Sequence, residues 1–125
     1  MNTMSHCTPE QQLSFLQLYF ATVDLLTEAQ EKYRRLIDQV ADISQRSHYR
    51  ALLLESERDL ELMKNQRRAF LTDQLAIRPP SLSTVQNTII NAEKLAQTIA
   101  DVANANAIIN LASMGLMAFN AVLTA

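Results

Sequence analysis

The chain has 125 residues, a length that suits a single domain, and its 13 acidic and 11 basic residues give a formal net charge of −2. Because this balance provides neither a basic excess nor a basic stripe, it excludes the usual surface for nucleic acid, and we expect no nucleic-acid partner. With one glycine and no Asn-Gly or Asp-Gly pair, the chain lacks the residues of the tight turns that a sheet protein needs between its strands, and it is rich in helix formers, so the predicted fold class is all-α.

The first predicted helix spans residues 9–44. Thr8 can cap a helix and Pro9 suits the first helical position, whereas residues 1–8 are predicted to be a flexible N-terminus. Leu13, Phe20 and Leu36 are expected to widen the apolar stripe of this helix, as in a helix bundle. The stripe itself follows alternating steps of three and four residues, with Gln30 in its one polar position: Leu16, Tyr19, Val23, Leu26, Tyr33, Ile37 and Val40.

A second helix is predicted over residues 47–77, after a turn near residues 44–48, with Ser47 as its cap. A continuous helix through this region remains an alternative, because no residue there forbids one. With a turn, the two helices form a long antiparallel hairpin. The heptad positions of the second helix are Tyr49, Leu53, Leu60, Met63, Phe70 and Ile77, with polar Ser56, Arg67 and Gln74 between them.

A third helix is predicted over residues 83–124. Pro79 and Pro80 end the second helix, and Ser81 or Ser83 caps the third. It carries three charges, Glu93, Lys94 and Asp101, and none follows Asp101. At about 60 Å, such a helix outreaches the hairpin, so it either bends near residues 104–106 or projects beyond it.

The expected architecture is therefore one domain over residues 9–125, a coiled-coil-like three-helix bundle that forms a dimer. Residues 107–125 are uncharged, and their apolar side chains need cover from the chain itself, a partner or lipid. A second copy of the chain would cover them most simply.

Sites for chemistry are not indicated by the sequence. His6, Cys7 and Glu10 fall short of a zinc site, and His48 has no rigid acid and nucleophile beside it. The pair Glu57 and Glu61 lacks the histidines of a di-iron bundle. A single glycine, Gly115, excludes the glycine-rich nucleotide loops. We therefore expect no cofactor, no metal and no enzymatic activity.

The sequence predicts an adaptor or chaperone-like protein that binds another protein, or itself, through its C-terminal helix. Small helical helpers of bacterial secretion have this general character, an analogy at the level of architecture alone. The alternative is a membrane-active protein whose C-terminal helix inserts into a bilayer. A single cysteine favours the cytoplasm. The predicted partner-binding residues, in which the polar members set the register, are Asn106, Ile108, Ile109, Ser113, Leu116, Phe119, Asn120 and Leu123.

Overall fold

The computed structural model describes residues 9–71, 81–101 and 104–124, and these are almost entirely helical, which confirms the all-α prediction. The four helices are α1 (Pro9–Gln39), α2 (Ile43–Leu71), α3 (Leu82–Asp101) and α4 (Ala105–Thr124). α1 begins at the predicted proline. The predicted flexible N-terminus and the predicted end of the second helix at residues 72–77 lie outside the described residues.

The turn between α1 and α2 comes earlier than predicted. α1 ends at Gln39 instead of residue 44, and α2 begins at Ile43 instead of residue 47. Asp42 explains the difference, because its Oδ1 accepts a hydrogen bond from the Ser44 amide at 3.2 Å. Aspartate and serine are equally good N-caps, so the preference for a cap residue does not by itself choose Asp42 over Ser47, and the cap is observed at Asp42.

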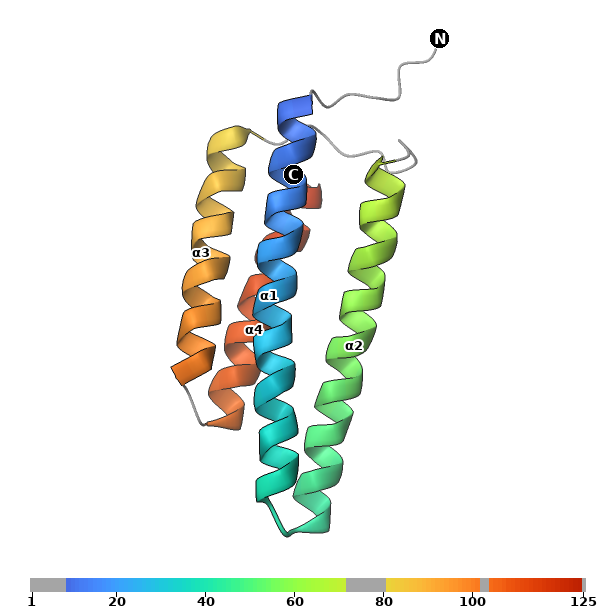
Figure 1. The fold of residues 1–125 in the computed structure, drawn as a ribbon, viewed down its shortest axis with the longest axis vertical. Helices are drawn as coiled ribbons and strands as arrows, with labels where there is room; N and C mark the ends of the chain where they lie inside the picture. The colour runs from blue at the N-terminus through green and yellow to red at the C-terminus, as the bar shows by residue number, and fades with distance from the viewer. Residues whose placement is uncertain (1–8, 72–80, 102–103, 125) are drawn as a thin grey trace.

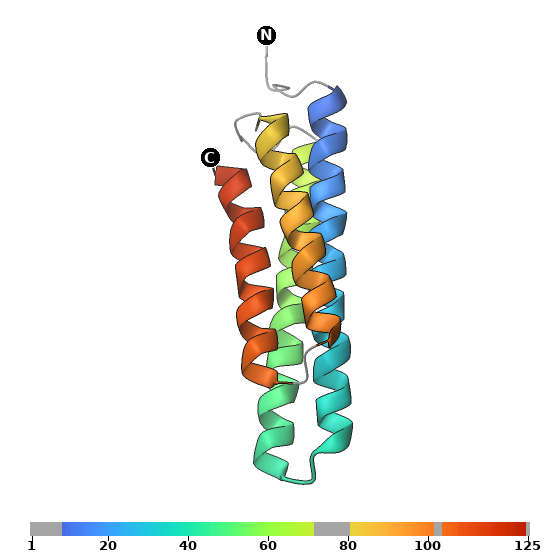
Figure 2. The same ribbon diagram turned by 90° about the vertical axis from the view of Figure 1, so that its left-hand side faces the viewer.

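The predicted third helix is two helices, so the three-helix bundle was wrong, and α4 begins within the region near residues 104–106 where a bend was the expected alternative. At the start of α3, the Thr84 amide donates to Ser81 Oγ at 3.1 Å, which confirms the serine cap. At the start of α4, the Ala107 amide donates to Asn104 Oδ1 at 3.1 Å, so Asn104 caps a new helix. The chain reverses direction between α3 and α4 (Figures 1 and 2), and α4 is thereby packed against the chain instead of projecting from it.

The helices are not packed evenly around a square. α1 packs against each of the other three, and α3 and α4 pack against each other. α2 packs closely on α1, whereas no Cα atom of α2 approaches α3 or α4 within 8 Å. Figure 1 shows α2 running back alongside α1, and the turn that joins them extends beyond α3 and α4. The bundle therefore has an open side, between α2 and α4.

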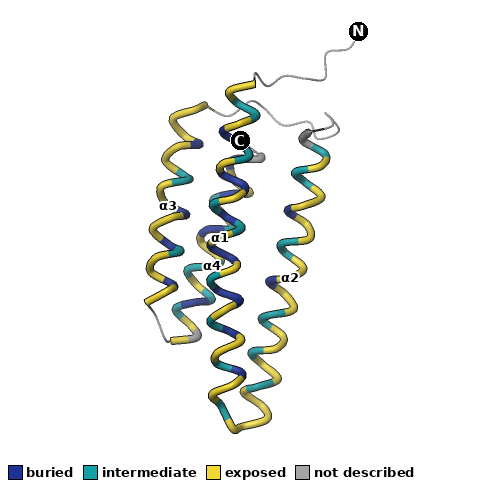
Figure 3. The backbone as a smooth tube through the Cα atoms, in the orientation of Figure 1, coloured by how far each residue is buried: buried dark blue, intermediate teal, exposed yellow. Residues whose placement is uncertain are grey.

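The core follows α1 along its length, as the buried segments in Figure 3 show. One cluster of buried side chains joins all four helices, and a second joins α1, α3 and α4. Together the two clusters comprise Phe15, Leu18, Tyr19, Leu26, Met63, Val85, Phe119 and Val122, and then Leu25, Ala29, Tyr33, Leu95, Ile99 and Ile108.

The predicted apolar stripe accounts for only part of the buried face of α1. Tyr19, Leu26 and Tyr33 are buried as expected. Leu13 and Phe20 do not widen the stripe, because they are 58% and 53% exposed. The widening occurs on the other side, at residues such as Phe15, Leu18, Leu25 and Ala29, since α3 and α4 pack there.

Polar heptad residues meet across the α1–α2 seam. Gln30 Nε2 donates a hydrogen bond to Ser56 Oγ at 3.2 Å, and both residues are buried. Nearer the other end of the seam, the Arg67 guanidinium lies 5.0 Å from the centre of the Tyr19 ring, within cation–π distance. If α2 slid along α1, the buried side chains of Gln30 and Ser56 would lose their hydrogen bond, which costs energy. This pair therefore helps to fix the position of α2 along α1.

Candidate functional site: a groove between α2 and α4

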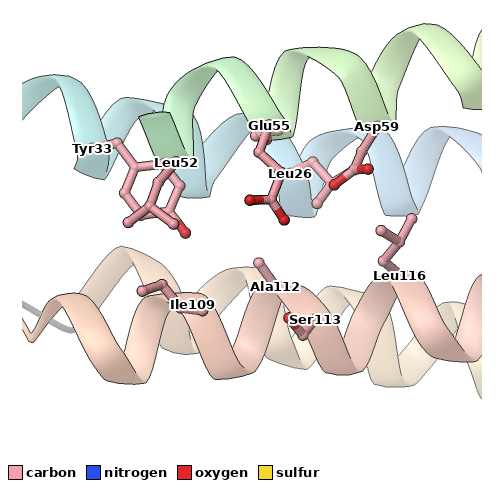
Figure 4. Close-up of a pocket in the computed structure, with 10 residues that line it drawn as sticks. Leu26, Tyr33, Leu52, Glu55, Asp59, Ile109, Ala112, Ser113 and Leu116 are labelled. Carbon is pink, nitrogen blue, oxygen red and sulfur yellow. The ribbon is translucent and has the colours of Figure 1, made fainter. Parts of the chain in front are cut away.

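The open side of the bundle forms a groove in which side chains from three helices meet (Figure 4). α1 provides the floor, α2 one wall and α4 the other. The lining residues are Leu26 and Tyr33 from α1, Leu52, Glu55, Ser56 and Asp59 from α2, and Ile109, Ala112, Ser113 and Leu116 from α4.

α4 presents two apolar faces, one to the core and one to the groove. Ile108 and Phe119 are fully buried against α1 and α3. Ile109 and Leu116, which are seven residues apart and so share a face, are half-buried on the groove wall. Gly115 lies on the core side, where an added Cβ would overlap Cδ2 of Leu25. The glycine therefore allows α4 to lie close to α1, which brings the groove wall next to its floor.

The α2 wall carries the charges of the groove. Glu55 is exposed at the edge, and Asp59, one turn further along, is half-buried. Burial raises the pKa of the Asp59 carboxyl, the Glu55 charge raises it further, and Arg58 opposes the shift. Within the described ranges, no cationic side chain lies within 4.0 Å of either carboxylate. α4 has no charged residue at all.

Tyr33 closes one end of the floor. Its burial, with a smaller contribution from the Glu55 charge, raises the pKa of the Tyr33 hydroxyl to about 12. The phenol is therefore neutral at physiological pH, so the floor contributes apolar surface and no charge.

The groove is too shallow for a typical small-molecule site. Its hollow has a volume of about 50 Å³, whereas ligand pockets usually enclose roughly 300–1,000 Å³. In the described part of the chain, no three potential metal-ligating side chains come together. The groove instead combines apolar side chains from three helices with the two carboxylates of α2, which suits contact with a polypeptide segment better than enclosure of a small ligand.

The predicted partner-binding residues are divided among three environments. Ile109, Ser113 and Leu116 line the groove, whereas Ile108 and Phe119 lie in the chain's own core. Asn106 and Asn120 are exposed on α4, and the side chain of Leu123 lies outside the described residues. The helix-wide apolar pattern did not distinguish core from groove, because it does not reveal which face meets α1.

The residues of α1 and α2 that line the groove were not identified from the sequence. Leu52 and Asp59 are seven residues apart and so share one face of α2, a spacing that could have indicated a common surface. Glu57 and Glu61, the pair considered for a metal, line a different hollow together with Lys64. His48 is exposed near the start of α2, with its ring 5.7 Å from that of Tyr49.

No helix in the described part of the chain combines the length and the apolar character needed to cross a membrane. Comparisons with protein-family models, with curated proteins and with solved structures found no match for this chain. The groove is therefore the feature of the molecule from which a function can be inferred.

Proposed function

We propose that this protein is a non-enzymatic adaptor, chaperone-like in its action, that holds an apolar helical segment of another protein between α2 and α4. In this proposal the antiparallel hairpin of α1 and α2 supplies the floor and one wall, and α4 supplies the other wall. A single cysteine, Cys7, leads us to propose a cytoplasmic location, because it allows no disulfide within the chain.

The observation that carries the proposal is the separation of α2 from α4. Their Cα atoms do not approach within 8 Å, and Leu26 and Tyr33 form the floor between them. A helix bound between α2 and α4 would cover the half-buried side chains of the groove. It would pack against them as neighbouring helices of the bundle already pack against each other. Ile109 and Leu116 share one face of α4 and line the hollow, so they present an apolar wall to a helix seated there.

A designed peptide tests this proposal without knowledge of the natural partner. The probe is a fluorescent amphipathic peptide of about five helical turns, with a leucine stripe and glutamine on its polar face. Its binding to the full chain is followed by fluorescence anisotropy. Leu116→Asp puts a charge on the groove wall, and we expect it to weaken binding at least about tenfold.

Met117→Asp is the matched control. Met117 adjoins Leu116 in sequence but is 71% exposed on the outer face of α4, so the same charge there should leave peptide binding unchanged. Circular dichroism establishes that both variants remain helical. If the wild-type chain does not bind the peptide, or if both variants weaken binding equally, the groove is not the binding site.

A second copy of the chain is the other candidate partner. The outer face of α4 favours it, because Met114 and Met117 are 55% and 71% exposed on a helix that carries no charge. Exposed apolar surface marks interaction sites, and methionine packs adaptably in them. For such a homodimer, sedimentation equilibrium should give a dimer mass for the wild type and a monomer mass for Met117→Asp. A monomeric wild type would contradict it.

The membrane-active alternative makes a different prediction. A C-terminal helix that inserts into lipid would carry the full chain to the top of a density gradient with liposomes, whereas an adaptor would remain at the bottom. Flotation of the wild type would therefore favour the membrane function over the adaptor.

A further inference from the structure

The groove contains two negative charges that α4 does not balance. Glu55 and Asp59 are four residues apart on α2, so their Cα atoms are separated by about 6 Å along the helix axis, on the same face. Figure 4 shows both carboxylates directed into the space between α2 and α4. The facing wall, formed by Ile109, Ala112, Ser113 and Leu116, is uncharged.

The other side of α2 differs. There Glu57 Oε2 lies 4.0 Å from Arg34 Nη2, and Lys64 lines the same hollow as Glu57 and Glu61. Within the described ranges, Glu55 and Asp59 have no cation within that distance. Like charges one turn apart on a helix repel each other, so this pair offers the chain itself no energetic benefit.

We infer that the partner segment is a basic amphipathic helix. Its apolar stripe packs on Leu26 and Leu116, and one of its lysine or arginine side chains reaches the space between Glu55 and Asp59. This inference rests on the proposed function and names the chemistry of the partner. Ion pairs in a partly desolvated groove are stronger than those on an open surface, because water screens them less. α4 of a second copy carries no cation and would leave both carboxylates unpaired.

Three versions of the amphipathic peptide test the inference, with lysine, glutamine or glutamate at two positions one turn apart beside the leucine stripe. We expect the lysine peptide to bind the wild-type chain at least about tenfold more tightly than the glutamate peptide at low salt, with a smaller difference at high salt. The double variant Glu55→Gln/Asp59→Asn should bind the lysine and glutamate peptides equally. This variant removes a like-charge pair, so it should remain folded, which a thermal melt establishes.

The double variant Glu57→Gln/Glu61→Gln is the matched control, because it removes the same charge from the other side of α2. It should keep the preference for lysine. Equal binding of all three peptides to the wild type would overturn the inference and leave the adaptor function standing. Loss of the preference in the control would also overturn it, since net charge would then explain the effect. If none of the three peptides binds, both the inference and the adaptor function fail.

Discussion

Phe119→Ala tests whether α4 belongs to the core of its own chain. Phe119 is fully buried, and its ring centroid lies 6.0 Å from that of Phe15 on α1, with an interplanar angle of 40°. Truncation of a buried phenylalanine costs about 3–5 kcal/mol, and the total stability of a domain is roughly 5–15 kcal/mol. We therefore expect the variant to lose at least about a fifth of its free energy of unfolding, with a fall in Tm on the order of 10 °C.

The measurement is urea unfolding followed by circular dichroism, at two protein concentrations a factor of about ten apart. A contact within one chain predicts the same loss at both concentrations, whereas a contact between chains predicts a loss that depends on concentration. Met117→Ala is the control, and because Met117 is 71% exposed it should change stability by less than about 0.5 kcal/mol. A loss below about 1 kcal/mol for Phe119→Ala, or a concentration-dependent one, would refute the placement of α4 in the core.

Three further predictions concern the seam, the groove floor and the break before α4. Gln30→Leu leaves the buried Ser56 hydroxyl without its hydrogen-bond partner and should cost about 1–3 kcal/mol of stability. The added change Ser56→Ala should restore most of this loss. Additive losses in a double-mutant cycle, measured by urea unfolding, would contradict the hydrogen bond between the two side chains. Tyr33 ionises near pH 10 in the unfolded chain and near 12 in the folded one, so the folded state loses stability as the pH rises through this interval. Between pH 10 and pH 12, the Tm of the wild type should therefore fall more steeply than that of Tyr33→Phe. Parallel Tm curves for the two proteins would contradict the raised pKa of Tyr33. Asn104→Ala removes the acceptor of the Ala107 amide and should cost about 1 kcal/mol in thermal unfolding, whereas Asn104→Asp, which can still cap, should not.

Local signals determined the features of the fold that were predicted correctly. Pro9 begins α1 and Ser81 caps α3 because both effects act within a single turn of helix. The heptad spacing also identified Gln30 and Ser56 as polar seam positions, and they meet across the α1–α2 seam. Periodicity of this kind follows from helix geometry and needs no knowledge of neighbouring elements.

The number of helices was not decided locally. Nothing between Asp101 and Asn106 forbids a helix, and Asn104 is compatible with either a helix interior or a cap. The reversal there buries Ile108 and Phe119 against the chain, a gain of packing that a straight helix would forgo. Because that gain depends on α1 and α3, it could not be seen in the sequence of the segment.

By itself, the sequence determined that the chain is helical and that the face of α4 carrying Ile109 and Leu116 is apolar, because both properties depend on the order of the residues along one helix. The tertiary structure decided which α4 face lies in the core and which lines a groove, and it placed Glu55 and Asp59 opposite that groove wall. The physical reason is that helices far apart in the sequence become neighbours through the packing of the whole chain, so the chemistry of the space between them belongs to no single segment.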